Sequence, residues 1–370
     1  MNSCAAHFLY LERQNYETPM NQLSQDEKYM QRCLQLAQLA EGYTYPNPMV
    51  GSVIVHQGKI IGEGYHRKAG EPHAEVNAVH SVQDKELLKE STLYVNLEPC
   101  AHYGKTPPCS KLIIDHEIPQ VVIGCIDSFS EVSGKGVAMM ESAGVKVRSG
   151  ILEKDSLELN RRFFTFHNKQ RPYIILKWAE TQDGYIDIER NEDNYGQPTW
   201  ITNEWARRAV HKQRTTEQAI LVGTYTAIKD NPSLTVRDWV GNQPLRCVID
   251  RRCQLSTNAH LLDQSMATVV YNYQKEECND NIEYVKFSAE ADFPEQILND
   301  LWRRGIQSVI IEGGQTTLQN YIDAGLWDEA FQYKGDIFFN KGVKSPKIEG
   351  EIVRKLNLGT SQLFIYRNNL

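Results

Sequence analysis

The sequence predicts two consecutive α/β domains. The first reason is length, because a chain of 370 residues exceeds the size at which one hydrophobic core usually stops growing. The second is the alternation of short apolar strands with helical patterns between residues 50 and 143. The third is another series of the same kind, which begins after the polar, proline-ended connector at residues 167–172.

The first domain is expected to span residues 24–168. Ser24 precedes Glu27 by three residues, the signature of a capping box at the start of a helix. Residues 1–23 show no periodicity, and we expect them to form a disordered leader. Strands are predicted at residues 50–55, 93–97 and 121–125, and helices at 73–82, 109–116 and 134–143. This order favours a layered α/β domain with a largely parallel sheet.

The second domain is expected to span residues 169–370. It contains a further set of apolar segments that end in glycine, aspartate or polar residues, which is typical of buried strands. These segments are residues 173–177, 219–223, 245–250, 267–271 and 308–314. No repeat relates the two halves, so each is expected to build its own sheet.

Composition and charge exclude several classes of protein. The chain is 41% hydrophobic and 24% charged, and no run approaches the roughly 18 apolar residues of a membrane span. The N-terminus lacks the basic start and apolar run of a secretion signal, so we expect a cytoplasmic protein. A net charge of -7 disfavours nucleic acid as a partner. Eight scattered cysteines are too sparse for a disulfide scaffold, which favours metal binding or catalysis for a close pair.

A zinc site is predicted from His73, Cys100 and Cys109. Catalytic zinc takes three protein ligands from thiolate, imidazole or carboxylate groups and leaves the fourth position for water. His73 and Cys109 each begin a predicted helix, and Cys100 follows a predicted strand. Glu75 is not needed as a ligand and can carry protons, as the glutamate of zinc deaminases does. We therefore predict a zinc-dependent hydrolytic deaminase.

The alternative is a structural zinc site or no metal at all. A structural site usually has four protein ligands, and no further Cys or His has the expected short spacing. A single His-x-Glu is common, and a lone cysteine is usually a small buried hydrophobic residue. The combined order His-Ala-Glu, Pro-Cys and Pro-Pro-Cys is much more specific than its parts, which favours the deaminase.

The spacing of these residues is similar to that of a known family. Eight residues separate Cys100 from Cys109, and the segment Pro46-Asn47-Pro48-Met49-Val50-Gly51 lies upstream. From about Ser24 to the C-terminus, the chain resembles the bifunctional deaminase/reductase family of riboflavin biosynthesis. The resemblance implies a cytidine-deaminase-like layered domain, followed by a dihydrofolate-reductase-like domain. It also implies zinc and NADPH as cofactors.

The resemblance further implies a phosphorylated aminopyrimidine as substrate. The deaminase would hydrolyse the 2-amino group of a phosphoribosylamino-diaminopyrimidinone, and the reductase would convert its ribosyl group to a ribityl chain. The residues that would hold the deaminase substrate are Asn47, His66, His102 and Lys105. Lys105 suits a phosphate, because an ammonium on a glycine-flanked loop can reach an anion.

In the second half, the resemblance implies residues for both ligands. The NADPH contacts would be Ala179, Trp200, Thr226, Asp230, Gly313, Gly314, Gln315, Thr316 and Thr317. The substrate contacts would be Lys177, Arg214, Leu234, Arg237 and Glu312. No G-x-G-x-x-G fingerprint is present, which argues against a Rossmann domain. The glycine turn at 313–314 lies between a strand and a helix start, where backbone N–H groups suit a pyrophosphate.

Some positions depart from the family pattern. Thr181-Gln182-Asp183-Gly184 replaces a more usual Ser-Leu-Asp-Gly, Asn231 stands where a second aspartate is common, and residues 127–130 replace a frequent Asp-Pro-Asn-Pro turn. None removes a predicted zinc ligand. The alternatives that stay open are a deaminase of another nucleobase or nucleoside with an inactive reductase half, and a binding protein that has lost its chemistry. A homodimer formed through the reductase half is expected from the resemblance.

Overall fold

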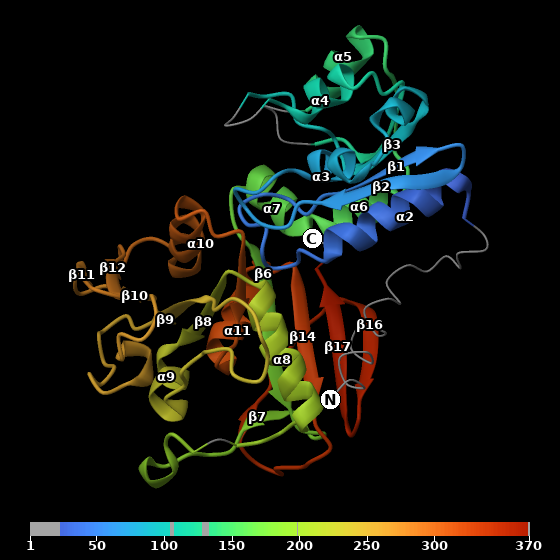
Figure 1. Ribbon diagram of the computed structural model, residues 1–370. Helices are drawn as coiled ribbons and strands as arrows, with labels where there is room; N and C mark the ends of the chain where they lie inside the picture. The colour runs from blue at the N-terminus through green and yellow to red at the C-terminus, as the bar shows by residue number, and fades with distance from the viewer. Residues whose placement is uncertain (1–22, 104–106, 128–132, 198, 369–370) are drawn as a thin grey trace. The chain divides into compact units, whose positions relative to one another are not determined.

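The computed structural model describes residues 23–103, 107–127, 133–197 and 199–368, and it divides into two units, residues 1–169 and 170–370 (Figure 1). The division follows Lys169, the last residue of helix α7. The leader expected at residues 1–23 lies outside the described residues except for Leu23, whose side chain is buried. None of the helices in the described ranges is long and apolar enough to cross a membrane.

The first unit is built on one sheet in the order β2-β1-β3-β4-β5. Its strands are β1 (Gly51–His56), β2 (Lys59–Tyr65), β3 (Thr92–Leu97), β4 (Gln120–Cys125) and β5 (Lys146–Ser149). Its helices are α2 (Gln25–Gln38), α3 (Ala74–Ser81), η3 (Lys85–Glu90), α4 (Cys109–Asp115), α5 (Lys135–Ser142), α6 (Glu153–Leu159) and α7 (Arg161–Lys169).

Alternating side chains divide this sheet between two layers of helices. Ile54 of β1 packs with residues of α3, α4 and α5, whereas its neighbours Val53 and Val55 pack against α2. Successive side chains of a strand point to opposite faces, so both faces of the sheet are apolar. The prediction of a layered α/β domain is therefore confirmed, and the helices that carry His73 and Cys109 lie in one layer.

The prediction of a largely parallel sheet is wrong in one part. Strands β3, β4 and β5 are parallel, but β1 pairs antiparallel with both β2 and β3. Strand β2 was not predicted; it joins β1 through a tight turn at Gln57 and Gly58. Both residues have positive φ, at 47° and 75°. A two-residue turn of this kind closes an antiparallel hairpin, and glutamine is an unusual residue at its first position.

The second unit contains a larger sheet in the order β11-β12-β10-β9-β8-β13-β6-β14-β17-β16. Its strands are β6 (Tyr173–Glu180), β8 (Ala219–Gly223), β9 (Leu245–Ile249), β10 (Thr268–Asn272), β11 (Glu277–Asn279), β12 (Ile282–Lys286), β13 (Ser308–Ile311), β14 (Glu329–Lys334), β16 (Glu351–Leu358) and β17 (Ser361–Arg367). Strands β7 (Tyr185–Asp187) and β15 (Val343–Lys344) form a separate pair.

Helices cover both faces of the parallel part of this sheet. The helices of this unit are η4 (Glu192–Asn194), α8 (Glu204–Thr216), α9 (Thr224–Asp230), η5 (His260–Leu262), α10 (Phe293–Arg303) and α11 (Gln315–Asp323). Leu221 of β8 packs in a cluster with α10 and α11, whereas Ile220 and Val222 pack in a cluster with α9. The strands from β12 to β14 run parallel, so their carboxyl ends lie along one edge of the sheet.

Candidate active sites

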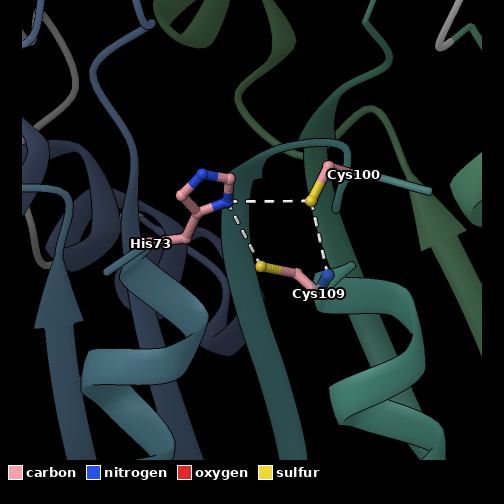
Figure 2. A group of neighbouring side chains, drawn as sticks. All are labelled: His73, Cys100 and Cys109. Atoms are coloured by element: carbon pink, nitrogen blue, oxygen red, sulfur yellow. Dashed lines mark hydrogen bonds between the residues drawn. The ribbon is translucent and has the colours of Figure 1, made fainter. Parts of the chain in front are cut away.

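The three predicted zinc ligands lie together in the first unit. His73 is the N-cap of α3, Cys100 lies in the loop after β3, and Cys109 is the first residue of α4. The Nδ1 atom of His73 lies 3.7 Å from Cys100 Sγ and 3.4 Å from Cys109 Sγ. Figure 2 shows the three side chains pointing toward one another, and all three ligand atoms lie within 4.8 Å of one another.

These distances fit a tetrahedral zinc ion. Zinc binds imidazole nitrogen at about 2.0–2.1 Å and thiolate sulfur at about 2.3 Å, which places a nitrogen and a sulfur ligand roughly 3.6 Å apart. The two nitrogen–sulfur distances, 3.7 and 3.4 Å, lie on either side of that value. No other His, Cys, Asp or Glu joins the group among the described residues. A donor set of one imidazole and two thiols is that of a catalytic rather than a four-ligand structural site.

The surroundings of the cluster favour a thiolate ligand and a proton carrier. The Cys109 backbone N–H donates to Cys100 Sγ at 3.3 Å. Hydrogen bonds from the side chains of Cys109 and His73 lower the pKa of Cys100. Glu75 is buried, with 3% of its surface exposed, and burial raises the pKa of its carboxyl group. Glu75 and Cys109 shift each other's pKa, so the carboxyl lies beside the ligands without being one of them.

Two of the predicted substrate contacts lie beside the zinc ligands. The His66 ring packs edge-on against that of His73, with centroids 5.5 Å apart. His66 Nδ1 lies 3.2 Å from the carbonyl oxygen of Pro72, and its Nε2 lies 3.0 Å from Asn47 Nδ2. This pattern assigns the proton to Nδ1 and makes Nε2 the acceptor. Burial lowers the pKa of His66, which favours the neutral ring.

The other two predicted contacts lie in the segment between the cysteines. His102 is exposed in that segment. Lys105 lies outside the described residues, as do positions 128–130 of the departure at residues 127–130. The structure therefore brings Asn47 and His66 to the cluster and leaves the roles of His102 and Lys105 as expectations.

Glu98 is a buried residue of this site that the sequence analysis missed. Its carboxylate accepts backbone N–H groups from Gly136 at 2.9 Å and Gly134 at 3.0 Å, and from Asp127 and Val137 at 3.3 Å. A Cβ at Gly136 would lie 2.1 Å from the carbonyl oxygen of Pro99, so only glycine allows α5 to approach this closely. Glu98 thus ties the start of α5 to the turn that presents Cys100.

A second site lies in the second unit, in a cavity of about 1060 Å³. All residues that the resemblance assigned to the reductase line this cavity, except Gly313. They are Lys177, Ala179, Trp200, Arg214, Thr226, Asp230, Leu234, Arg237, Glu312, Gly314, Gln315, Thr316 and Thr317. Residues more than a hundred positions apart in the chain therefore meet in one cavity, at the carboxyl ends of the parallel strands.

A buried carboxylate lies between two cations in this cavity. Arg214 donates from Nε and one terminal nitrogen to the two oxygens of Glu312, at 2.8 Å each, and Lys177 Nζ lies 3.5 Å from the same carboxylate. Although burial raises the pKa of Glu312, the charges of Arg214 and Lys177 lower it to about 2. Burial lowers the pKa of Lys177. Arg214 already donates two parallel hydrogen bonds to Glu312. Arg237 is therefore better placed than Arg214 to bind a phosphate through two such hydrogen bonds.

His211 also lines the cavity and was not predicted. Its Nδ1 accepts the backbone N–H of Arg237 at 3.2 Å. Burial, together with the charge of Arg214, lowers the pKa of His211 to about 4, so the ring is neutral at physiological pH. Its signal in the sequence was weak, because one histidine on a helix shows no spacing that distinguishes it.

The glycine turn of the cavity fits a dinucleotide. Gly314 is the N-cap of α11, and no side chain caps that helix. A Cβ at Gly314 would lie 3.0 Å from Thr226 Oγ1, and one at Gly223 would lie 2.4 Å from Thr317 Oγ1. Glycine at both positions keeps the backbone accessible, and the first N–H groups of a helix bind phosphate readily. The cavity is at the upper end of the size of small-molecule sites.

Two departures from the family pattern have clear structural roles. Thr181 Oγ1 donates to Asp183 at 2.6 Å, and Asp183 accepts the N–H of Asn340 at 2.7 Å, which closes the turn after β6. Asn231 has a positive φ of 42°, and its side-chain oxygen accepts the N–H of His260 at 2.8 Å. Asparagine tolerates this left-handed conformation well.

Comparison with known proteins assigns both units. Residues 23–125 match the cytidine and deoxycytidylate deaminase zinc-binding region, and residues 172–359 match the RibD C-terminal domain. The riboflavin biosynthesis protein RibD of Aquifex aeolicus is 39% identical over 88% of both chains, and that of Bacillus amyloliquefaciens is 38% identical over the same shares. The crystal structure of a diaminohydroxyphosphoribosylaminopyrimidine deaminase/5-amino-6-(5-phosphoribosylamino)uracil reductase from Thermotoga maritima has a TM-score of 0.84 at 35% identity, and it covers 93% of this chain and 99% of that one.

The fold, the His–Cys–Cys cluster and the large cavity define a bifunctional enzyme, a zinc-type deaminase followed by a reductase. The chain belongs to the RibD family of riboflavin biosynthesis proteins. The expected deaminase and reductase activities and the expected cofactors, zinc and NADPH, are thereby confirmed. An inactive reductase half is not favoured, because relatives match along both units.

Proposed function

We propose that the first unit hydrolyses the 2-amino group of a phosphoribosylamino-diaminopyrimidinone. The observation that carries this proposal is the convergence of His73, Cys100 and Cys109 beside the buried Glu75. The substrate follows from the activity named for the Thermotoga maritima protein. We assign residues 24–168 to the deaminase and residues 169–370 to the reductase.

In this mechanism, His73, Cys100 and Cys109 would hold zinc, and a bound zinc ion would supply a water molecule of lowered pKa as the nucleophile. Glu75 accepts a proton as the C–O bond forms at the carbon that bears the amino group. It then delivers that proton to the nitrogen as the C–N bond breaks, and ammonia leaves. A carboxyl whose pKa is raised by burial suits both steps. Asn47 and His66 hold the pyrimidine, and His102 and Lys105 approach its phosphorylated arm.

The second unit reduces the deaminated product. When bound, NADPH supplies hydride to the sugar carbon of the ring-opened imine. Arg237 binds the substrate phosphate. Arg214 and Lys177 hold the Glu312 carboxylate in position to contact the sugar of the substrate. The glycine turn and α11 bind the pyrophosphate, and Ala179, Trp200, Thr226 and Asp230 complete the cofactor site. The protein thus supplies orientation and charge, and the cofactor supplies the chemistry.

The enzyme is further proposed to be a cytoplasmic homodimer that acts on small molecules and not on nucleic acid. Support for the dimer comes from β16, an edge strand on which Ile352 and Val353 are exposed at 51% and 40%. An exposed apolar edge strand is a surface that a second chain can cover. Sedimentation of the wild type and of Ile352→Lys tests this, since a dimer through this edge would be weakened in the variant.

A metal and product assay tests the proposed deamination. Purified protein is expected to contain one zinc per chain and to release ammonia from the phosphoribosylamino-diaminopyrimidinone. Cys109→Ser should lose both zinc and ammonia release, while Cys278→Ser, which changes an exposed cysteine of the other unit, should lose neither. Zinc-loaded protein that releases no ammonia from this substrate would show that the substrate is wrong.

A further inference from the structure

The loop that presents Asn47 is held by two asparagine side chains from distant parts of the first unit. Asn96 lies in β3, and Asn160 lies between α6 and α7. Both are buried, with 0% and 2% of their surface exposed. A buried amide needs hydrogen-bond partners, and these two find them in the backbone of residues 49–51. Asn96 and Asn160 together are called the asparagine clamp.

Asn160 engages both backbone groups of Met49. Its Oδ1 atom accepts the Met49 N–H at 2.8 Å, and its Nδ2 atom donates to the Met49 carbonyl oxygen at 2.9 Å. The two residues are 111 positions apart in the chain. The side chain therefore pairs with Met49 as a neighbouring strand would, although Met49 lies before the start of β1.

Asn96 continues the pairing of β1 with β3 by one residue. The backbone pairing of these strands ends at Ser52 and Val95. Beyond that pair, Asn96 Oδ1 accepts the Gly51 N–H at 2.7 Å, and its Nδ2 donates to the Met49 carbonyl oxygen at 3.1 Å. The Met49 carbonyl thus accepts hydrogen bonds from both members of the clamp.

A short and stiff connection joins the clamp to Asn47. Only Pro48 separates Met49 from Asn47, and Pro46 lies on the other side of Asn47. A proline ring fixes φ, so these two positions have little freedom to absorb a movement of the loop. A shift of the Met49 backbone is therefore passed on to Asn47.

The same loop sets the contact between Asn47 and His66. Asn47 Nδ2 lies 3.0 Å from His66 Nε2, and the His66 N–H donates to the Val50 carbonyl oxygen at 2.9 Å. Because His66 engages the Nδ2 end of the Asn47 amide, Oδ1 is the end that can accept from an N–H group of the pyrimidine. The orientation of this amide thus depends on where the loop is held.

We propose that Asn96 and Asn160 are positioning residues of the deaminase, which hold Asn47 against His66 in the arrangement that binds the pyrimidine. This inference rests on the proposed role of Asn47 in holding the substrate. The clamp acts through the backbone of residues 49–51 and not by touching the substrate. Loss of either amide removes partners of the Met49 backbone and frees the loop to move.

Substrate binding to zinc-loaded Glu75→Gln protein of full length tests the proposal without turnover. In that background, Asn160→Ala should raise the Kd of the phosphoribosylamino-diaminopyrimidinone roughly 3- to 10-fold in calorimetry, the range expected for one hydrogen bond. Asn96→Ala, in a different element, should have the same effect and makes the test if Asn160→Ala does not fold. Zinc content should be unchanged. The matched control is Asn272→Ala, which removes an equally buried amide of the second unit that donates to two backbone carbonyl groups and should leave this Kd unchanged.

A double-mutant cycle separates positioning from a general structural role. Combined with Asn47→Ala, Asn160→Ala should weaken binding little further, because the residue through which it acts is missing. An equal further loss of affinity in that background would overturn the proposal, since Asn160 would then act independently of Asn47.

The single variants distinguish failure of the clamp from failure of the proposed function. If Asn47→Ala weakens binding but neither Asn96→Ala nor Asn160→Ala does, the role of Asn47 stands and the clamp is refuted. If Asn47→Ala binds the substrate as tightly as its parent, Asn47 does not hold the pyrimidine. That part of the proposed function then fails, and the inference fails with it.

Discussion

Arg214 binds both oxygens of the Glu312 carboxylate at 2.8 Å, and this pair lies between helix α8 and the end of strand β13. Both side chains are about nine-tenths buried. Lys177 approaches the same carboxylate, so one buried anion faces two cations. The arrangement keeps Glu312 ionised and orients it toward the cavity.

We predict that Glu312→Gln destabilises the second unit by about 3–5 kcal/mol, because it leaves buried cations without their anion. Urea unfolding of the full chain measures the change. Glu349→Gln removes an exposed carboxylate and should alter the free energy of unfolding little. Equal stabilities of the two variants would show that the ion pair does not hold this part of the fold.

His211 predicts a pH dependence of stability. Its pKa is lowered to about 4 from an ordinary value of 6.5, so the unfolded chain takes up a proton before the folded chain does. The stability from this group is fully present above pH 6.5 and is lost as pH falls toward 4. His211→Asn keeps an acceptor for the Arg237 N–H but does not titrate. The difference in unfolding free energy between wild type and variant should therefore change between pH 6.5 and 4, and a constant difference would contradict the account.

Glu98 predicts an effect confined to the deaminase. Its carboxylate accepts hydrogen bonds from four backbone N–H groups next to the Cys100 turn. In Glu98→Gln, the amide NH2 replaces one carboxylate oxygen, so a donor faces some of these N–H donors. We expect weaker zinc retention and ammonia release lowered at least 10-fold, with NADPH oxidation on deaminated substrate unchanged. Glu141→Gln, at an exposed position of α5, is the matched control. Retained zinc affinity in Glu98→Gln would mean that the network does not support the ligand.

Removing the metal should separate the two activities. A chelator that takes zinc from His73, Cys100 and Cys109 is expected to abolish ammonia release. Reduction of the deaminated pyrimidine should persist, because the reductase residues line a cavity of the second unit. Zinc added back should restore ammonia release. Loss of both activities on chelation would contradict this independence.

The sequence predicts the zinc ligands better than it predicts their support. His73, Cys100 and Cys109 are recognisable because zinc chemistry restricts both their residue types and their flanking residues. Glu98 is not, because its partners are backbone N–H groups from residues 127–137, and any residue type carries such a group. The residues of the cavity in the second unit could be predicted from the resemblance, whereas the order of the strands that bring them together could not be predicted from a local pattern.

The same contrast holds for the fold. The capping box at Ser24 and Glu27 was predicted, and both of its hydrogen bonds are present. Buried parallel strands such as β8 and β13 were found because they are continuous apolar runs. Strands β14 and β16 were missed, because they mix polar with apolar residues. Both strands pair with β17 in the folded sheet. Pairing across distant segments is not visible in a local pattern.

The most direct test of the central claim follows ammonia release and NADPH oxidation together, on the phosphoribosylamino-diaminopyrimidinone, in wild type and Glu75→Gln. We predict that the wild type releases ammonia and then oxidises NADPH. Glu75→Gln should retain zinc but lose ammonia release roughly 100- to 10,000-fold, while still reducing deaminated substrate. Glu90→Gln, at an exposed position of the same unit, should match the wild type. Undiminished ammonia release from zinc-loaded Glu75→Gln would contradict the account.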